Sequence, residues 1–431
     1  MAQAAAIPVS THPMKKVLGI RDFKLLWIGQ ATSMLGDQFH SIAASWLVLK
    51  MTGDPMALGM VMAISGIPRA LFTVIGGAVT DRISPRKLML ITDFVRLFLS
   101  TMLAVQIFTG TLQVWMVYIY AAVTGIMGGL FGPASMSIVP HIVPEEDLQA
   151  GNSLTQGTSS LIGFVGPAIA GAMIAAFANE ATGMGIAIAV DALTFVVSVI
   201  TLWMMHSGEI VKTTAEKEAA GNIFASVKEG FAFMVKDPVL RMMFIMIALA
   251  NLCFTGPLLV GIPFLADTRF SGGAAAYGII ISGYAGGNLL GIILSGILPK
   301  PKKSMIRLLM VVMFAAFGFG IAAMSWISVT WLATANLFIL GVLNGYISIL
   351  LITGLQRSTP KAMLGRLMSM ILLANMSMMP ISQALSGAAL RWSVIAVFVT
   401  AGLLQLGLSV VMAFSASVSD LSDRLLGEEG S

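Results

Sequence analysis

The sequence predicts an all-α membrane protein with twelve transmembrane helices, and three observations lead to this fold class. Of the 431 residues, 57% are hydrophobic and only 10% are charged. Soluble globular chains carry about 25% charged residues, so most of this surface must face lipid. Apolar runs of about 20 residues, the length that crosses a bilayer as a helix, recur along the whole chain. Alternating segments of about ten residues, typical of β-barrels, do not describe the pattern.

Twelve apolar runs follow one another, separated by short polar turns. They lie at 23–49, 56–80, 88–109, 113–139, 151–178, 183–206, 240–266, 274–298, 305–326, 330–356, 367–390 and 393–417. Residues 1–22 carry Lys15, Lys16 and Arg21 but no apolar core. They therefore predict an N-terminal tail rather than a cleavable signal peptide.

The distribution of basic residues predicts the orientation. If the N-terminus is cytoplasmic, most of the 25 lysines and arginines fall on the cytoplasmic side, as the positive-inside rule requires. Lys50, Arg269 and Arg391 fall outside, and Arg69 and Arg96 fall within apolar runs. The net charge of +5 is therefore a topology signal and does not indicate a nucleic-acid partner. We expect a multi-pass protein of the bacterial inner membrane with both termini in the cytoplasm.

One long polar interruption divides the chain into two halves. Residues 207–239 separate six apolar runs within 23–206 from six within 240–417, and the tails are 1–22 and 418–431. The second part of this linker has helical periodicity and predicts an amphipathic helix on the cytoplasmic surface.

The sequence contains no motif that indicates an enzyme. Cys253 is the single cysteine and lies in an apolar run, so a disulfide within the chain and a cysteine-based metal site are excluded. The four histidines are scattered, and no H-E-x-x-H, G-x-S-x-G or P-loop pattern occurs. We therefore expect neither an enzyme nor an ATP-driven pump, and we predict no cofactor and no metal.

A charged turn after the second apolar run points to a family. The stretch GGAVTDRISPRK (76–87) resembles the loop signature G-x-x-x-D-R-x-G-R-R/K of the major facilitator superfamily. The matching residues are Gly77, Asp81, Arg82, Arg86 and Lys87.

A second motif narrows the resemblance. The stretch GFVGPAIAG (163–171) resembles an exporter-associated motif through Gly163, Gly166, Pro167 and Gly171. Further stretches, such as DALTF (191–195) and LGRLMS (364–369), are similar to the branch that holds macrolide and enterobactin exporters. The resemblance implies two pseudo-symmetric six-helix bundles that rock about a midplane site, a small-molecule substrate and a monomeric state.

Ionisable residues inside the apolar runs are the main candidates for the site, since buried charges are costly and usually face a cavity or a partner. Asp37 and Arg69 both lie near mid-depth on consecutive helices, at about 1.5 Å of rise per residue. We expect them to face one another or the cavity, so that protonation of Asp37 releases Arg69 or a substrate cation. His40 lies one turn from Asp37 and could assist. The alternative is a fixed pair that only orients the two helices.

Three more ionisable residues have both a functional and a structural interpretation. Asp93 and Arg96 stand three residues apart, so they can share a helix face and pair locally; here the structural interpretation is favoured. Asp191 lies in the run 183–206 and serves equally well as a site residue or as a bond between helices. Thirty-one methionines suit an adaptable cavity, with NMSMMP (375–380) as the best local candidate and ordinary packing as the alternative.

The charged turn also suggests a conformational latch. Asp81 follows the C-terminal end of a helix, where the dipole disfavours a negative charge. Arg366, at the start of the run 367–390, is a basic residue on the same membrane face. We therefore predict that Asp81 bridges the two bundles there and holds the cytoplasmic side closed.

The function predicted from these features is a secondary active exporter of small amphipathic compounds, driven by proton entry. A siderophore or a lysophospholipid is the alternative cargo, because Arg69 and Arg96 suit an anionic headgroup whereas Asp37 suits a cation. A non-transporting membrane sensor is a further alternative.

Overall fold

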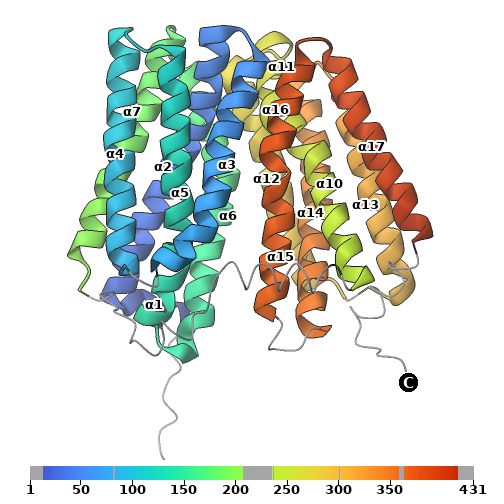
Figure 1. The fold of residues 1–431 in the computed structure, drawn as a ribbon, viewed down its shortest axis with the longest axis horizontal. Coiled ribbons are helices and arrows are strands. Elements are labelled where there is room, and N and C mark those ends of the chain that lie inside the picture. Colours follow the sequence, from blue (N-terminus) through green and yellow to red (C-terminus); the bar gives the residue numbers. More distant parts are fainter. Residues whose placement is uncertain are drawn as a thin grey trace, which may run out of the picture.

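The computed structural model describes residues 13–80, 83–206, 235, 237–299, 301–358 and 364–415, and all regular structure within these ranges is helical. The first group of helices stands together on one side of the molecule (Figure 1). It comprises α1 (Pro13–Gly19), α2 (Arg21–Thr52), α3 (Pro55–Thr80), α4 (Pro85–Thr109), α5 (Val114–Ile142), the short η1 (Glu145–Asp147), α6 (Leu148–Ala175) and α7 (Glu180–Met204). We call it the N-terminal bundle.

The second group stands on the other side and forms the C-terminal bundle (Figure 1). It comprises α10 (Pro238–Gly256), η2 (Pro257–Gly261), α11 (Ile262–Thr268), α12 (Gly273–Ile297), α13 (Lys303–Ala323), α14 (Thr330–Ser358), α15 (Leu364–Ser377), α16 (Met379–Leu390) and α17 (Val394–Phe414). Most of the predicted linker, 207–234 and 236, lies outside the described residues, so its amphipathic helix and the domain boundaries remain predictions.

The helix ends follow local sequence chemistry. Gly53 and Gly110 end α2 and α4 in the left-handed conformation, with φ of 63° and 69°, which glycine adopts without a steric penalty. Asn179 and Asp237 begin α7 and α10, and their side-chain oxygens accept hydrogen bonds from the first backbone amides of each helix.

Ten helical segments in the described part of the chain are long and apolar enough to cross a membrane. The predicted membrane-spanning, all-α class is therefore confirmed, while the count of twelve is not. Two of the predicted runs account for the difference. Helix α2 carries Gln30, Asp37 and His40 along its length, which lower its hydropathy. The run 367–390 is divided at Met378 into α15 and α16, of 14 and 12 residues.

The two bundles touch near one end of the molecule and diverge toward the other, where α1 and the end of α17 lie (Figure 1). We call the first the closed end. One apolar core at this end draws on both bundles and includes Trp46, Tyr277 and Phe398. Two smaller cores lie within single bundles, one around Phe23 and Met89 and one around Met243 and Met310.

Glycines allow the close approach at the closed end. A Cβ atom on Gly278 of α12 would overlap the carbonyl oxygen of Pro167 in α6, and one on Gly171 of α6 would overlap that of Ala274. The hydroxyl of Ser282 also accepts a hydrogen bond from the amide of Ala168 at 2.9 Å. Backbones in membrane bundles approach this closely only where side chains are small.

Candidate functional site

Each bundle contains a cavity, and the two differ in chemistry. The cavity of the N-terminal bundle has a volume of about 580 Å³ and is lined by α2, α3, α4 and α5, with Asp37, His40, Arg69 and Arg96 among its lining residues. The cavity of the C-terminal bundle has a volume of about 420 Å³. Methionine, aromatic, aliphatic, amide and hydroxyl side chains line it, and none of its described lining residues carries a formal charge at neutral pH.

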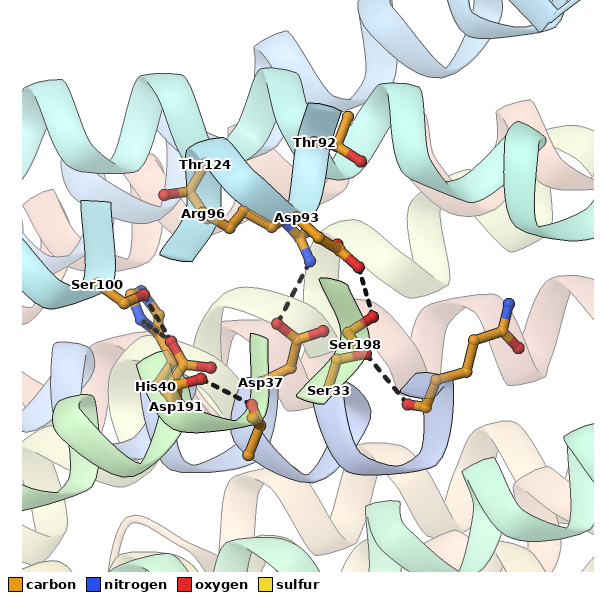
Figure 2. Close-up of polar contacts among 12 residues, drawn as sticks. Ser33, Asp37, His40, Thr92, Asp93, Arg96, Ser100, Thr124, Asp191 and Ser198 are labelled. Carbon is orange, nitrogen blue, oxygen red and sulfur yellow. Dashed lines mark hydrogen bonds and ion pairs between the residues drawn. The ribbon is translucent and has the colours of Figure 1, made fainter. Parts of the chain in front are cut away.

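Asp37 and Arg96 form an ion pair at the wall of the first cavity. The Nη1 atom of Arg96 lies 3.6 Å from Oδ1 of Asp37 (Figure 2). The Asp37 side chain is 48% exposed, whereas that of Arg96 is 7% exposed. The guanidinium carbon lies 5.6 Å from the ring centre of Phe131 and 5.5 Å from that of Phe195, so two cation–π contacts hold it in place. The Asp37 carboxylate thus faces the cavity, and the buried guanidinium of Arg96 balances its charge.

Arg69 also lines this cavity, as the sequence predicted, but the ion pair of Asp37 is with Arg96 instead. Arg69 of α3 and Arg96 of α4 both approach Gly128 of α5. A Cβ atom on Gly128 would stand 2.9 Å from Nη2 of Arg96 and 3.2 Å from Nε of Arg69. Glycine at this position therefore leaves room for two guanidinium groups next to one carboxylate.

Asp191 is buried behind the cavity and is reached through His40. Its Oδ2 atom accepts a hydrogen bond from Ser100 at 2.7 Å and lies 3.1 Å from Nδ1 of His40 (Figure 2). The side chain of His40 is 24% exposed and that of Asp191 is 1% exposed. His40 therefore connects the cavity to a carboxyl group with little direct access to it.

Asp93 is fully buried and bonded to α7. Its Oδ2 atom accepts a hydrogen bond from the Ser198 hydroxyl at 2.6 Å. The ion pair of Arg96 is with Asp37 rather than with Asp93: Asp93 points to α7, while the longer Arg96 side chain reaches Asp37 on α2 (Figure 2). Within the described chain, Oδ1 of Asp93, Nε of Arg96 and Oδ1 of Asp191 are buried without a hydrogen-bond partner. Such groups are uncommon in native proteins and call for an explanation in each case.

A sequence pattern marks the members of this network, although not how they pair. Each of its three helices carries a polar stripe with spacings of three and four residues, which puts the side chains on one helix face. The stripes are Ser33, Asp37 and His40 on α2; Asp93, Arg96 and Ser100 on α4; and Asp191, Thr194 and Ser198 on α7. The acids and bases were recognised from the sequence, but the serines that bind them were not.

The predicted latch lies largely outside the described residues. Asp81, Arg82 and the side chain of Arg366 are among the parts not described, so the proposed bridge remains a prediction. Gly77 lies in α3 with open space where a Cβ would stand, and Lys87 lies in α4. Arg86 donates hydrogen bonds to the carbonyl oxygens of Leu202 at 2.8 Å and Trp203 at 2.7 Å. Its visible role is to cap the C-terminal end of α7, within its own bundle.

The exporter motif lies on α6 and contacts both bundles. Gly166 faces Gln38 of α2, and a Cβ atom on this glycine would stand 2.6 Å from Cγ of Gln38, whereas Pro167 and Gly171 pack against α12. Gly163 has open space around it. Part of the motif therefore serves the contact between the bundles.

Ion pairs that the sequence did not predict join the bundles at the closed end. Arg391, after α16, binds Asp54, before α3, through two hydrogen bonds, with Nε donating to Oδ1 at 2.8 Å. The Nζ atom of Lys50 in α2 lies 2.8 Å from Oδ1 of Asp267 in α11, across the two bundles. Within its own bundle, the same atom lies 3.1 Å from Oε2 of Glu180 in α7.

Comparison with known proteins identifies the family. The model of the transmembrane secretion effector family matches residues 14–424. Macrolide efflux protein A of Streptococcus pyogenes is 25% identical over 281 residues, which cover 65% of this chain and 67% of that protein. The multidrug efflux pump Tap of Mycolicibacterium fortuitum is 26% identical over 238 residues, covering 54% of this chain and 56% of the pump.

Solved structures share the fold at low sequence identity. A peptide transporter POT in complex with sulfate superposes with a TM-score of 0.69 at 17% identity, covering 95% of this chain and 99% of the transporter. A bacterial homologue of the iron transporter ferroportin, in an inward-facing state, gives 0.68 at 17% identity, covering 92% and 99%. These similarities concern the fold alone.

Proposed function

This chain belongs to the transmembrane secretion effector family of the major facilitator superfamily, and we propose that it is a secondary active exporter of small amphipathic compounds. The two bundles alternate between states open to opposite sides of the membrane, and protons enter as the substrate leaves. The efflux proteins of Streptococcus pyogenes and Mycolicibacterium fortuitum, to which the chain is similar, support the direction of transport.

The orientation follows from the basic residues of the sequence. The positive-inside rule places both termini in the cytoplasm. The closed end of the molecule then faces the outside, and the end where the bundles diverge faces the cytoplasm (Figure 1). The state described here therefore receives substrate and releases protons on the cytoplasmic side.

The observation that carries the proposal is the position of Asp37. A carboxyl group within a membrane-spanning bundle is costly and belongs to a functional site by default. This one is 48% exposed at a cavity, with Arg96 3.6 Å away. A proton and a cationic substrate can each take the place of Arg96 at this carboxylate, but not both at once. Competition for one carboxylate couples proton entry to substrate exit, because each ligand favours the state that binds it better.

His40 and Asp191 supply the proton path in this proposal. His40 touches the cavity, and its Nδ1 lies 3.1 Å from the buried Asp191. A proton taken up by His40 can be held by this pair while Asp37 binds the substrate. Asp93 and Ser198 position α4 against α7 and so fix the place of Arg96.

An anionic cargo is the second candidate, because Arg69 stands next to Arg96 at Gly128 and lines the same cavity. Two guanidinium groups can bind a phosphate or a carboxylate headgroup in bidentate geometry. A siderophore or a lysophospholipid would carry such a group.

Flux into proteoliposomes tests the proposal. The purified chain is reconstituted, a proton gradient is imposed, and accumulation of tetraphenylphosphonium and of lysophosphatidylglycerol is measured. We expect gradient-driven accumulation of the cation. Asp37→Asn should abolish both accumulation and the exchange of labelled for unlabelled cation, because the proton and the cation bind to the same carboxylate. Glu145→Gln, at an exposed position of η1, should behave as wild type. Transport of the lysophospholipid alone would replace the cation by the anionic cargo. Transport of neither would favour a sensor.

A further inference from the structure

We propose that the cavity of the C-terminal bundle binds the uncharged, largely apolar part of a substrate. This part carries a hydrogen-bond donor, and the side-chain oxygen of Gln405 accepts that hydrogen bond. The inference rests on the proposed export function and extends it: the N-terminal cavity receives the charged end of an amphipathic substrate, and the C-terminal cavity receives its neutral body.

The lining of the cavity excludes a charged ligand group. Its volume of about 420 Å³ falls in the range of roughly 300–1,000 Å³ that is usual for small-molecule sites. No described residue that lines it is charged at neutral pH, so a ligand charge would be buried there without a counter-ion. The charged part of an amphipathic substrate must therefore lie elsewhere, and the N-terminal cavity holds both Asp37 and the two arginines.

The walls suit a flat or ring-shaped apolar group. The ring centre of Phe254 lies 5.2 Å from that of Tyr284 and 5.0 Å from that of Phe317. Six methionines complete much of the remaining wall: Met243, Met246, Met310, Met313, Met379 and Met412. Methionine side chains are flexible and polarizable, so they adapt to ligands of different shape.

The side-chain oxygen of Gln405 is a hydrogen-bond acceptor for which no described residue supplies a donor. The side chain lines the cavity from α17 and is 1% exposed. Its Nε2 donates to the carbonyl oxygen of Ala250 at 3.3 Å. Because a carbonyl can only accept, the amide nitrogen must face Ala250, and this fixes the direction of the oxygen. No described residue donates a hydrogen bond to that buried oxygen. A ligand hydroxyl or amide would supply the missing donor.

Two helices are irregular at this cavity. In the first, α10 passes into the π-helical η2 at Pro257, and Leu258 and Leu259 of η2 line the cavity. In the second, α15 gives way to α16 at Met378, and Met379 lines the cavity. Ser382 joins the two breaks by accepting from the amide of Gly256 at 2.7 Å and donating to Leu252 at 2.6 Å. Irregular backbone at membrane depth is tolerated where it lines a cavity, and it often marks a binding site.

Two neutral steroids of similar size test the inference. Corticosterone carries hydroxyl donors, whereas progesterone has only ketone acceptors. Their affinities for the full chain in lipid nanodiscs are measured by equilibrium dialysis. We expect corticosterone to bind the wild-type chain about tenfold more tightly, since an unpaired buried acceptor costs about 1–3 kcal/mol and each 1.4 kcal/mol is tenfold in affinity.

Three variants make the result specific. Gln405→Met should bring the affinity ratio close to one while progesterone binding is kept. Ser409→Ala removes a buried hydroxyl one turn away on the same helix, which bonds to Val311 rather than lining the cavity, and should keep the wild-type ratio. Met379→Trp fills the cavity and should weaken both steroids at least tenfold. Melting temperatures confirm that each variant is folded.

The outcomes separate this inference from the proposed export function. Equal affinity of the two steroids for the wild-type chain, or a preference that survives Gln405→Met, would overturn the role of Gln405. Binding that Met379→Trp leaves unchanged would overturn the location. Failure of proton-driven flux together with a preserved steroid preference would instead contradict the transport proposal and leave the site in place.

Discussion

The guanidinium of Arg391 binds the carboxylate of Asp54 through two hydrogen bonds and so joins the C-terminal bundle to the N-terminal bundle. Nε donates to Oδ1 at 2.8 Å, and Nη2 donates to Oδ2. The pair lies at the closed end, beside the contact of Lys50 with Asp267. When the bundles separate at this end, both contacts must break. They therefore stabilise the state described here relative to the opposite one.

The first prediction concerns this pair. Asp54→Asn and Arg391→Gln should each shift the conformational equilibrium two- to fivefold toward separation of the closed end, because a half-exposed ion pair contributes about 0.2–1 kcal/mol and bidentate geometry favours the upper part of that range. Spin labels at Thr111 and Trp326, in a Cys253→Ala background, report the distance between the bundles. The exchanged pair Asp54→Arg with Arg391→Asp should restore the wild-type distribution. An unchanged distribution in both single variants would contradict the stabilising role.

The second prediction is a pH dependence of the same equilibrium. The hydrogen bonds from Arg391, and to a lesser degree that from the Met56 amide, hold the pKa of Asp54 below its ordinary value. A carboxyl group with a lowered pKa stabilises the paired state at any pH above its ordinary pKa of about 4, and this stabilisation disappears as the pH falls through the lowered pKa.

Asp54 should therefore cause no change in the distance between the two spin labels from pH 5 to pH 8. Below about pH 4, the population with a separated closed end should grow. The part of the change due to Asp54 is the part that Asp54→Asn removes. If the variant and the wild type follow the same curve, the pair has no part in the response.

The third prediction measures the coupling between Asp37 and Arg96. Arg96→Gln leaves the Asp37 carboxylate and the buried Asp93 without this nearby cation, so it should lower the melting temperature. Asp37→Asn, which removes one of the charges that Arg96 balances, should be milder. The double variant should be more stable than the sum of the single effects predicts, with an interaction free energy of about 0.5–3 kcal/mol for contacting residues. If the stability changes of the two single variants simply add up in the double variant, Asp37 and Arg96 do not stabilise each other across their 3.6 Å separation.

The sequence revealed the ionisable members of the site but not their partners. Asp37, Arg69 and Asp191 stand out because they are isolated charges within apolar runs, and each was a candidate for that reason. Arg96 was assigned to Asp93 because three-residue spacing permits a local pair. The structure instead packs α7 against both α2 and α4, so Asp93 finds its partner on α7 and Arg96 finds its partner on α2. Which helices become neighbours is a tertiary property that spacing within one helix does not contain.

The ion pair of Asp54 with Arg391 and the cavity of the C-terminal bundle could not be predicted from the sequence, for two different reasons. Asp54 and Arg391 are 337 positions apart, and each lies in an ordinary polar turn. Their contact depends on how the two bundles sit against each other. The C-terminal cavity has no charged residue to mark it, and the buried Gln405 is an unremarkable amide in an apolar helix until its unpaired oxygen is seen. The methionines near 375–380 were a candidate, and Asn375 and Met379 do line this cavity.

The fourth prediction concerns the hydrogen bond between Ser198 and Asp93. Ser198→Ala removes the donor of a 2.6 Å bond to a carboxyl that is completely buried. The loss should destabilise the protein by about 1–3 kcal/mol, the cost of leaving a buried polar group unsatisfied. Thr101→Ala, on the exposed side of the same α4 helix, removes a hydroxyl that bonds only to its own helix and serves as the control. Chemical or thermal unfolding of both variants checks the difference, and equal stability of the two would show that the buried bond is not needed.

The fifth prediction uses the glycines that bring the bundles together. A side chain at Gly278 would overlap the carbonyl of Pro167, but only while the closed end is closed. Gly278→Val should therefore leave each bundle folded and raise the separated population at least tenfold, because the overlap disappears when α6 and α12 move apart. Gly163→Ala, in the same α6 motif but with open space at its Cβ position, should keep the wild-type distribution.

The spin labels at Thr111 and Trp326 measure the populations, and the melting temperature shows whether the variant is folded. A Gly278→Val protein that unfolds would point to a static packing role, and one with an unchanged label distance would show that the backbone can yield at this contact. A folded protein that is trapped apart would identify the contact between α6 and α12 as the surface on which the two bundles close.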